Sequence, residues 1–173
     1  MLKKIILRKL LTFLMSSSLL LSGEIFLSNS IAWSVLEWDS EMLKQVNISR
    51  QQAGVLPLKS CVGLQKAAQG FASSMAKGNF YSHKGKDGST PGDRLTKAGY
   101  FWEKSSQTTY IGENIAAGQT TVKQVMRGWL NSPPHRRNIL SPKFTHVGFG
   151  RATSSNSKYG IYWVQNFGSG VKC

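Results

Sequence analysis

One stretch of this sequence has the spacing of an amphipathic helix without interruption. Between residues 64 and 76 the apolar side chains recur every three or four positions, which places them on one side of a helix. They are Leu64, Ala67, Ala68, Phe71, Ala72, Met75 and Ala76. Gly78 is expected to end this helix. Because one side of the helix is apolar, the rest of the chain must supply the surface against which it packs.

The end of the chain has a different period. Residues 144–152 and 160–167 alternate between apolar and polar, which is typical of strands, and the turn-forming run 153–158 joins them. This pattern predicts an antiparallel hairpin. Because helices come first and antiparallel strands come late, the order favours an α+β fold over a parallel sheet.

Three more helices are expected. Asp39-Ser40 can cap one that ends at Gly54, and Thr90-Pro91-Gly92-Asp93 has the composition of a second helix start. Thr120 or Thr121 can cap a third, which Pro133-Pro134 should break after Trp129. The polar stretch 103–109 is expected to be a loop.

The first 32 residues have the pattern of a secretory signal peptide. A basic head (Lys3, Lys4, Arg8 and Lys9) precedes a largely apolar segment that is too short to span a bilayer, and Ser30-Ile31-Ala32 offers small residues for cleavage. An uncleaved anchor is the alternative. We therefore expect export to an extracellular or periplasmic location, with residues 33–173 forming a single domain that has no transmembrane segment.

The chain is strongly basic. Of its 173 residues, 22 are Lys or Arg and 8 are Asp or Glu, and loss of residues 1–32 would lower the formal net charge from +14 to +11. This excess favours polyanionic partners such as anionic cell-envelope polymers or lipids, although a solvated basic surface without a dedicated partner is an open alternative. Nucleic acid is not expected, because the chain is exported and no recognition motif is visible.

Two cysteines, Cys61 and Cys173, lie far apart in the sequence. In an oxidising compartment they would form a disulfide and hold down the end of the chain. The alternative is one buried thiol and one free terminal thiol.

Several catalytic classes have no support in the motifs. The chain contains no HExxH pair, no GxSxG elbow and no GxxxxGK[ST] loop. His83 follows a predicted helix end, and His135 follows Pro133-Pro134, so both imidazoles are expected on irregular segments. Two such histidines can bind zinc together with a carboxylate or water, but their spacing is no metal signature, and structural hydrogen-bonding roles are the alternative.

Glu113 is the carboxylate of most interest. It lies between Gly112 and Asn114 and leads into apolar residues, so partial burial is expected. Since a buried carboxylate needs a partner, a histidine or an arginine should lie beside it. Ser132 and Asn138 are expected to brace neighbouring loops by hydrogen bonds.

Several segments together resemble the bacterial branch of the CAP superfamily, which also includes cysteine-rich secretory proteins, insect venom antigens and plant pathogenesis-related proteins. The likeness covers roughly residues 43–167. It is carried by Tyr81-Ser82-His83, the 87–91 turn, Gly112-Glu113-Asn114-Ile115, the segment 129–140, and residues 144–150. The resemblance implies an α-β-α sandwich with a central antiparallel sheet and a cleft on one side.

Eukaryotic members line that cleft with two histidines and two glutamates, and some bind a divalent metal there. By resemblance, His83 corresponds to the first histidine and Glu113 to one glutamate. Ser132 stands where the second glutamate would be, and Lys143 falls near the second histidine. His135 is taken as the bacterial substitute, so one carboxylate of the set is missing.

Three functions remain open for this candidate site. The first is a secreted binding module whose cleft, formed by His83, Glu113, His135, Ser132 and Asn138, holds a lipid, a glycan or an anionic envelope polymer. The second is a metal-assisted hydrolase in which His83 and His135 bind zinc or another divalent metal and Glu113 is the catalytic base. The third is a structural histidine–glutamate cluster with no ligand.

Overall fold

The computed structural model describes residues 37–101, 109–169 and 173. The chain divides into two compact units, residues 1–39 and 40–173, and only residues 37–39 of the first are described. The expected signal peptide therefore lies outside the described residues, as does most of the expected 103–109 loop. Among the described helices, none has both the length and the apolar character needed to cross a membrane.

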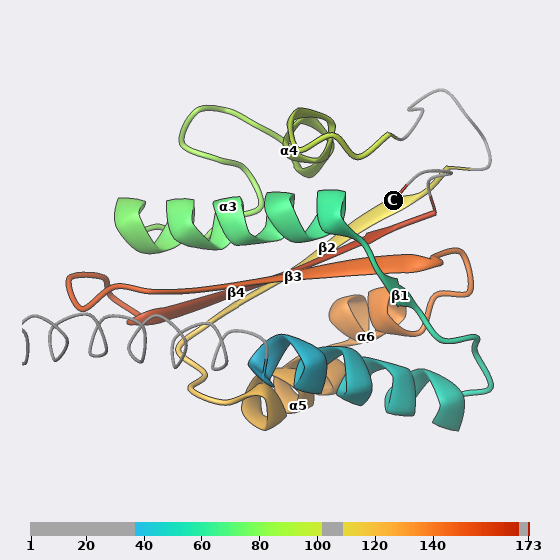
Figure 1. The fold of residues 1–173 in the computed structure, drawn as a ribbon. Coiled ribbons are helices and arrows are strands. Elements are labelled where there is room, and N and C mark those ends of the chain that lie inside the picture. The colour runs from blue at the N-terminus through green and yellow to red at the C-terminus, as the bar shows by residue number, and fades with distance from the viewer. Residues whose placement is uncertain (1–36, 102–108, 170–172) are drawn as a thin grey trace, which may run out of the picture. The chain divides into compact units, whose positions relative to one another are not determined.

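The second unit contains a four-stranded sheet with the order β1-β3-β4-β2 (Figure 1). β3 (His146–Thr153) and β4 (Ile161–Gly168) form the antiparallel hairpin that the alternating residues predict. β2 (Ile111–Ala117) pairs with β4 in antiparallel register, with Glu113 opposite Asn166. β1 (Lys59–Ser60) adds a two-residue parallel pair to β3. β2 was not expected from the sequence, because its Gly-Glu-Asn start lacks the residues favoured in strands.

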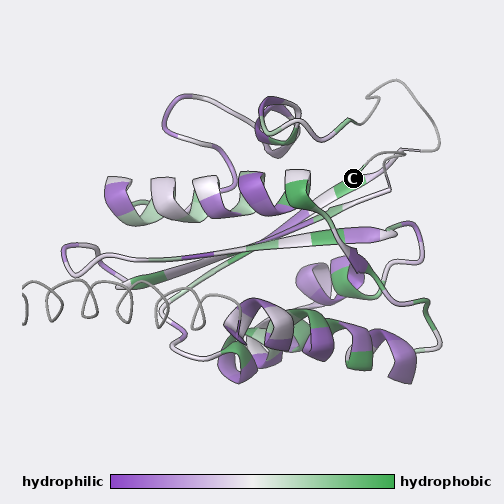
Figure 2. Ribbon diagram, in the orientation of Figure 1, coloured by the Kyte–Doolittle hydropathy of each residue, from purple (hydrophilic) through white to green (hydrophobic). Residues whose placement is uncertain are grey.

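The long helix α3 (Val62–Gly78) covers one face of this sheet, and all seven residues of the expected apolar side are buried. Figure 2 shows hydrophilic and hydrophobic residues following one another along this helix. Two glycines of β3 let the helix approach closely. A Cβ atom at Gly148 would overlap the backbone of Leu64 and Gln65, and one at Gly150 would overlap that of Ala68.

Two glutamines of α3 hydrogen-bond the backbone of β3. The Oε1 atom of Gln65 accepts from the Phe149 N–H at 2.8 Å. Gln69 accepts from the Arg151 N–H at 3.2 Å and donates its Nε2 to the Arg151 carbonyl at 3.0 Å. These amides continue the hydrogen bonding of β3 beyond the short pair that it forms with β1.

The remaining helices lie on both sides of the sheet (Figure 1). α4 (Pro91–Lys97) lies on the side of α3, while the helix over residues 40–52, α5 (Val122–Asn131) and α6 (Pro133–Ile139) lie on the other. Two of the three expected caps are present, since Thr90 with Asp93 and Thr121 with Gln124 form capping boxes. The third expectation is wrong, because Asp39 and Ser40 lie inside a helix that already includes residues 37 and 38. The α-β-α layering implied by the resemblance is therefore present.

One expectation about this region is wrong. Pro133-Pro134 was expected to end a helix and leave His135 on an irregular segment. α5 does end before them, but the two prolines begin α6, which contains His135. Proline is well suited to the first turn of a helix, because the N–H groups there have no intrahelical acceptor.

Arg50 holds the helix over residues 40–52 against the turn after α6. Its side chain is 1% exposed and donates to the carbonyls of Leu56 at 2.7 Å, Ile139 at 2.7 Å and Ser141 at 2.9 Å, with a longer contact to Phe144. Burial lowers the pKa of this guanidinium. No carboxylate partners it among the residues described, so backbone dipoles at the end of α6 compensate its charge.

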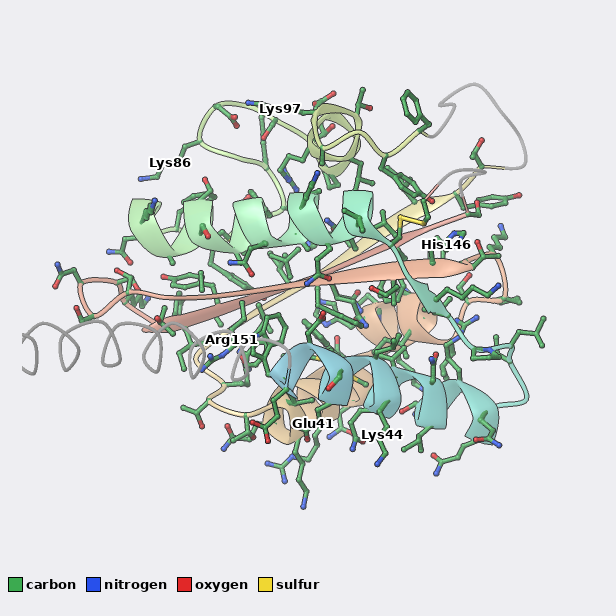
Figure 3. The ribbon with its side chains drawn as sticks, viewed as in Figure 1. Glu41, Lys44, Lys86, Lys97, His146 and Arg151 are labelled. Carbon is green, nitrogen blue, oxygen red and sulfur yellow. A yellow bond between two sulfur atoms is a disulfide. The ribbon has the colours of Figure 1, made fainter. Side chains whose placement is uncertain are left out.

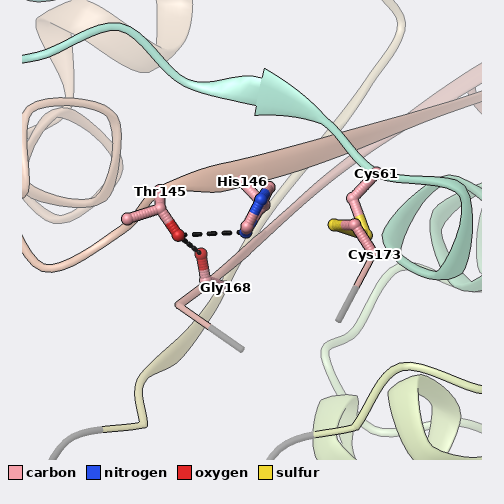
Figure 4. The surroundings of a disulfide bond; sticks show 5 residues. All are labelled: Cys61, Thr145, His146, Gly168 and Cys173. Atoms are coloured by element: carbon pink, nitrogen blue, oxygen red, sulfur yellow. Dashed lines mark hydrogen bonds between the residues drawn. A yellow bond between two sulfur atoms is a disulfide. The ribbon is translucent and has the colours of Figure 1, made fainter. Parts of the chain in front are cut away.

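Cys61 and Cys173 form a disulfide with Cα atoms 5.1 Å apart, across 112 positions of sequence (Figure 4). Cys61 is 1% exposed and lies directly between β1 and α3. The expected pairing is therefore present, and it attaches residue 173 to the start of the longest helix of the domain.

Replacing Arg50 with methionine should destabilise the domain by about 3 kcal/mol, because it leaves several buried carbonyls without donors. Thermal and urea unfolding of Arg50→Met measure this loss. Arg127→Met is the matched control, since Arg127 is exposed on α5 and is expected to change stability by less than about 0.5 kcal/mol. Equal stability of the two variants would contradict the role assigned to Arg50.

Candidate functional site

The free edge of β2 brings the candidate residues together. β2 is the last strand of the sheet, so only one of its edges pairs with another strand. Side chains hydrogen-bond the other edge. The Ile115 carbonyl accepts from the Tyr81 hydroxyl and from the Trp129 Nε1, both at 3.1 Å. The Glu113 carbonyl accepts from Asn138 at 3.3 Å. Three parts of the chain therefore meet at this edge: helix α5, helix α6 and the segment that follows α3.

The Glu113 carboxylate is buried and paired on both oxygens. His83 Nδ1 lies 2.8 Å from Oε1, and Arg94 Nη2 lies 2.8 Å from Oε2. The Glu113 side chain is 2% exposed, whereas that of His83 is 54% exposed. When its amide is oriented to satisfy its hydrogen bonds, Asn166 also donates to Oε2 at 3.3 Å. A carboxylate whose two oxygens already accept from these donors is poorly placed to accept a proton from a substrate.

Arg94 belongs to this cluster, although it was not among the site residues expected from the sequence. Its guanidinium donates to the carbonyls of His83 at 3.0 Å and Ser89 at 2.9 Å, and it lies 3.4 Å from the centre of the Phe71 ring. The sequence did predict that a histidine or an arginine would lie beside Glu113, but it did not identify Arg94 as that arginine. Arg94 is the residue after Asp93 of the α4 capping box, and its side chain reaches Glu113 of β2.

His135 occupies a different environment from His83. Its backbone carbonyl accepts from Asn114 at 3.2 Å, and its side chain is partly buried. Burial, and to a smaller extent the nearby His83, lower the pKa of His135. At neutral pH the imidazole is therefore neutral.

The His135 side chain lines a hollow of about 290 Å³ beside β2, which we call the β2-edge hollow. Its wall is mainly apolar, and polar groups occur at intervals along it. The apolar part includes Ile115, Ala116, Ala117, Val125 and Trp129, and the polar part includes Gln119, Ser132 and His135. Tyr81 and Tyr159 also line it, with ring centres 6.0 Å apart.

A second hollow of about 290 Å³ lies at the other end of β2. Residues 90–93 at the start of α4 and residues 111–113 of β2 line it. Glu113 lines this hollow, whereas His135 lines the β2-edge hollow. His83 and Glu113 are therefore in contact, while His135 and Ser132 line a neighbouring space.

Asn138 and Lys143 have local roles. The Asn138 amide donates to the Asn114 side chain at 2.8 Å as well as to the Glu113 carbonyl, so it fixes α6 to β2. Lys143 Nζ lies 4.4 Å from the centre of the Tyr110 ring. Neither residue supplies a ligand to the Glu113 carboxylate.

The arrangement does not fit a divalent metal ion. Across residues 37–101, 109–169 and 173, no three histidine, cysteine, aspartate or glutamate side chains come together as a metal site. Glu113 is paired with His83 and Arg94, and Ser132 stands at the position where a second carboxylate would be. A divalent metal needs several deprotonated ligands around one point, and this cluster offers none beyond its internal pairs.

Comparison with known proteins agrees with the fold. The sequence model of the family described as "Cysteine-rich secretory protein family" matches residues 43–167. The uncharacterized protein YkwD of Bacillus subtilis (strain 168) is 34% identical over 134 residues, which cover 78% of this chain and 48% of YkwD. The uncharacterized membrane protein YlbC of the same organism is 28% identical, covering 78% of this chain and 36% of YlbC. The chain thus spans about half, or less, of the length of these relatives.

Solved structures give the same result. An extracellular protein containing an SCP domain from Bacillus anthracis str. Ames is 29% identical with a TM-score of 0.63, over 75% of this chain and 39% of that one. An outer surface protein from Borrelia burgdorferi has a TM-score of 0.64 at 21% identity, over 76% of this chain and 91% of that one, and it supports the fold alone. The family match, the identity with YkwD and the shared fold together show that this chain belongs to the cysteine-rich secretory protein (CAP) family.

Proposed function

We propose that this protein is an exported binding module that holds the apolar part of an anionic lipid in the β2-edge hollow. The observation that carries the proposal is the composition of the hollow, an apolar wall with a few polar groups, which is typical of sites for amphipathic small molecules. The exposed part of this wall includes the rings of Tyr81 and Tyr159, which an acyl chain would contact better than a glycan or a hydrophilic polymer would.

Gly128 gives the hollow part of its width. It lies inside α5 and lines the hollow, and a Cβ atom there would meet no other atom within 4 Å. Glycine in a helix interior costs about 1 kcal/mol relative to alanine. Its presence is therefore consistent with a space kept open for a ligand.

The charges around the hollow favour an anionic headgroup. No aspartate or glutamate occurs between residues 114 and 173, whereas both helices that border the hollow carry cations. These cations are Lys123 and Arg127 on α5 and Arg136 and Arg137 on α6, and all four are exposed. None of the four lines the β2-edge hollow itself, so they would act on an acidic lipid headgroup through their long-range positive potential.

The paired state of Glu113 favours binding over catalysis. A general base must be able to accept a proton from a substrate or water, but both oxygens of Glu113 accept from His83 and Arg94. We assign Glu113 a positioning role, in which it joins the segment carrying His83 and α4 to the edge of β2.

Filling the hollow should abolish lipid binding. Gly128→Leu would place a side chain in the empty space and should weaken the binding of monomeric dihexanoyl phosphatidylglycerol by at least about tenfold. NMR titration below the critical micelle concentration, at low and high salt, measures this affinity. Binding to the wild type should be tighter at low salt. Gly70→Leu in α3 is the matched control and should bind as the wild type does. Equal affinity of Gly128→Leu and wild type would refute the proposed site.

Glu113→Gln should lower stability by about 2–4 kcal/mol, because it leaves the largely buried Arg94 guanidinium without a charged partner. Urea unfolding measures the change, and Glu41→Gln at an exposed position of the first helix is the control. Below its melting temperature, the Glu113 variant should keep lipid affinity within about threefold of the wild type. A stable variant that lost binding would instead make Glu113 a direct ligand contact.

The metal-assisted hydrolase is the second candidate function, and zinc titration tests it directly. We expect wild type, His83→Ala and His135→Ala to show the same weak zinc binding by calorimetry, because the site lacks a second carboxylate and Glu113 is already paired. Tight binding by the wild type that either substitution removed would support the metal site and count against the binding module.

A further inference from the structure

A separate groove lies between α3 and α4. It has a volume of about 350 Å³. One wall is a single face of α3, formed by residues 66, 67, 70, 71 and 74, and the other consists of residues of α4 and of the loop before it. None of its lining residues lines the β2-edge hollow. Ala67 and Ala98 supply apolar lining, whereas the Phe71 ring is 2% exposed and is covered by the Arg94 guanidinium.

Gly70 keeps this groove open. It lies in the interior of the 17-residue α3, where glycine costs about 1 kcal/mol relative to alanine. A Cβ atom at Gly70 would meet nothing within 4 Å, and its φ angle is not in the left-handed region. Gly63 of the same helix differs, because a Cβ atom there would lie 3.1 Å from Tyr100. No neighbouring atom therefore requires glycine at position 70, and its effect is to leave space on this face of α3.

The acidic groups of the groove are already engaged. Asp87 accepts from the Ser89 N–H at 3.0 Å, and hydrogen bonds from Ser89 lower the pKa of Asp87. Asp93 accepts from the Thr90 N–H at 2.9 Å and from the Thr90 hydroxyl at 2.7 Å, as part of the cap of α4. Both carboxylates thus have a local structural role.

The cationic side chains of the groove have fewer hydrogen-bond partners than its carboxylates. The ammonium group of Lys66 forms no hydrogen bond or ion pair with any residue in the described part of the chain. Lys97 lies beside the loop before α4, where its charge contributes to the lowered pKa of Asp87 (Figure 3). The buried Nε of Arg94 has no acceptor among the described residues, although its other nitrogens are bonded. The groove is thus lined by three cationic side chains and two carboxylates, and the Lys66 ammonium is the cation without a partner among the described residues.

We propose that the α3–α4 groove binds a small organic carboxylate, with its apolar body over Gly70 and Ala98 and its carboxylate held by Lys66 and Lys97. The acidic group supplies the acceptors that the donors lack, and charge-assisted hydrogen bonds to ammonium groups are stronger than neutral ones. This site is independent of the lipid site at β2. The same carboxylate chemistry occurs in a free organic acid and at the C-terminus of a short peptide.

NMR titration with hexanoate tests the site, with neutral hexanamide as the matched probe. Saturable shifts of the Gly70 and Lys97 amides are expected with hexanoate, and at least about tenfold weaker binding with hexanamide. Acetyl-Ala-Ala carries the same carboxylate at the C-terminus of a peptide. Tighter binding of hexanoate would indicate a free organic acid as the ligand, and tighter binding of acetyl-Ala-Ala would indicate a peptide C-terminus. Equal binding of hexanoate and hexanamide, or shifts that do not saturate with either acid, would overturn the proposal.

Substitutions in the α3–α4 groove test whether hexanoate binds there. Gly70→Leu should weaken hexanoate binding by at least about tenfold, and Lys66→Gln with Lys97→Gln by a similar factor, while Gly128→Leu should bind as the wild type does. Gly70→Ala is a second, smaller test that should raise the melting temperature through helix propensity and weaken binding less. Unchanged affinity in both Gly70 variants would overturn the site. Because Gly70→Leu and Gly128→Leu serve as controls for each other, failure of one site is distinguishable from failure of the other.

Discussion

The close packing of α3 on the sheet is the contact on which the rest of this domain depends. Gly148 and Gly150 remove side chains where the helix crosses β3, so the backbones approach more closely than a Cβ atom would allow. All seven apolar residues on one side of α3 are thereby buried. With α3 fixed, Phe71 lies under the Arg94 guanidinium, and Arg94 in turn reaches Glu113. The charged cluster is thus built on an apolar contact.

The polar residues at β2 follow from its position at the end of the sheet. A terminal strand has carbonyl groups that no strand pairs, and here Tyr81, Trp129 and Asn138 supply the missing donors. Side chains from three separate segments must therefore gather at one edge. The β2-edge hollow lies among these side chains, because single side chains fill less space along the edge than a paired strand would. The side-chain hydrogen bonds to this edge and the hollow beside it thus have a common origin.

The sequence predicts the periodic elements and two of the three helix caps, since α3, the hairpin and both capping boxes depend on local spacing. β2 was missed because its strand character depends on pairing with β4, and Gly112, Glu113 and Asn114 individually disfavour strands. The role of Pro133 was misread because proline both ends and begins helices. Among the candidate residues, His83 and Glu113 do meet, but Arg94 and the separation of His135 depend on tertiary packing that no local pattern encodes. Family resemblance located the region, and only the folded structure shows its hydrogen bonds.

The glutamines of α3 have a consequence for how this protein can meet other molecules. Gln65 and Gln69 occupy the backbone groups of β3 at residues 149 and 151, and side chains likewise occupy β2 at residues 113 and 115. A strand from another polypeptide would have to displace these amides and rings before it could add to the sheet. Association by strand addition, including the self-association that leads to fibrils, is therefore disfavoured at both places. Recognition by this domain is left to the side chains of its helices and to the spaces between them.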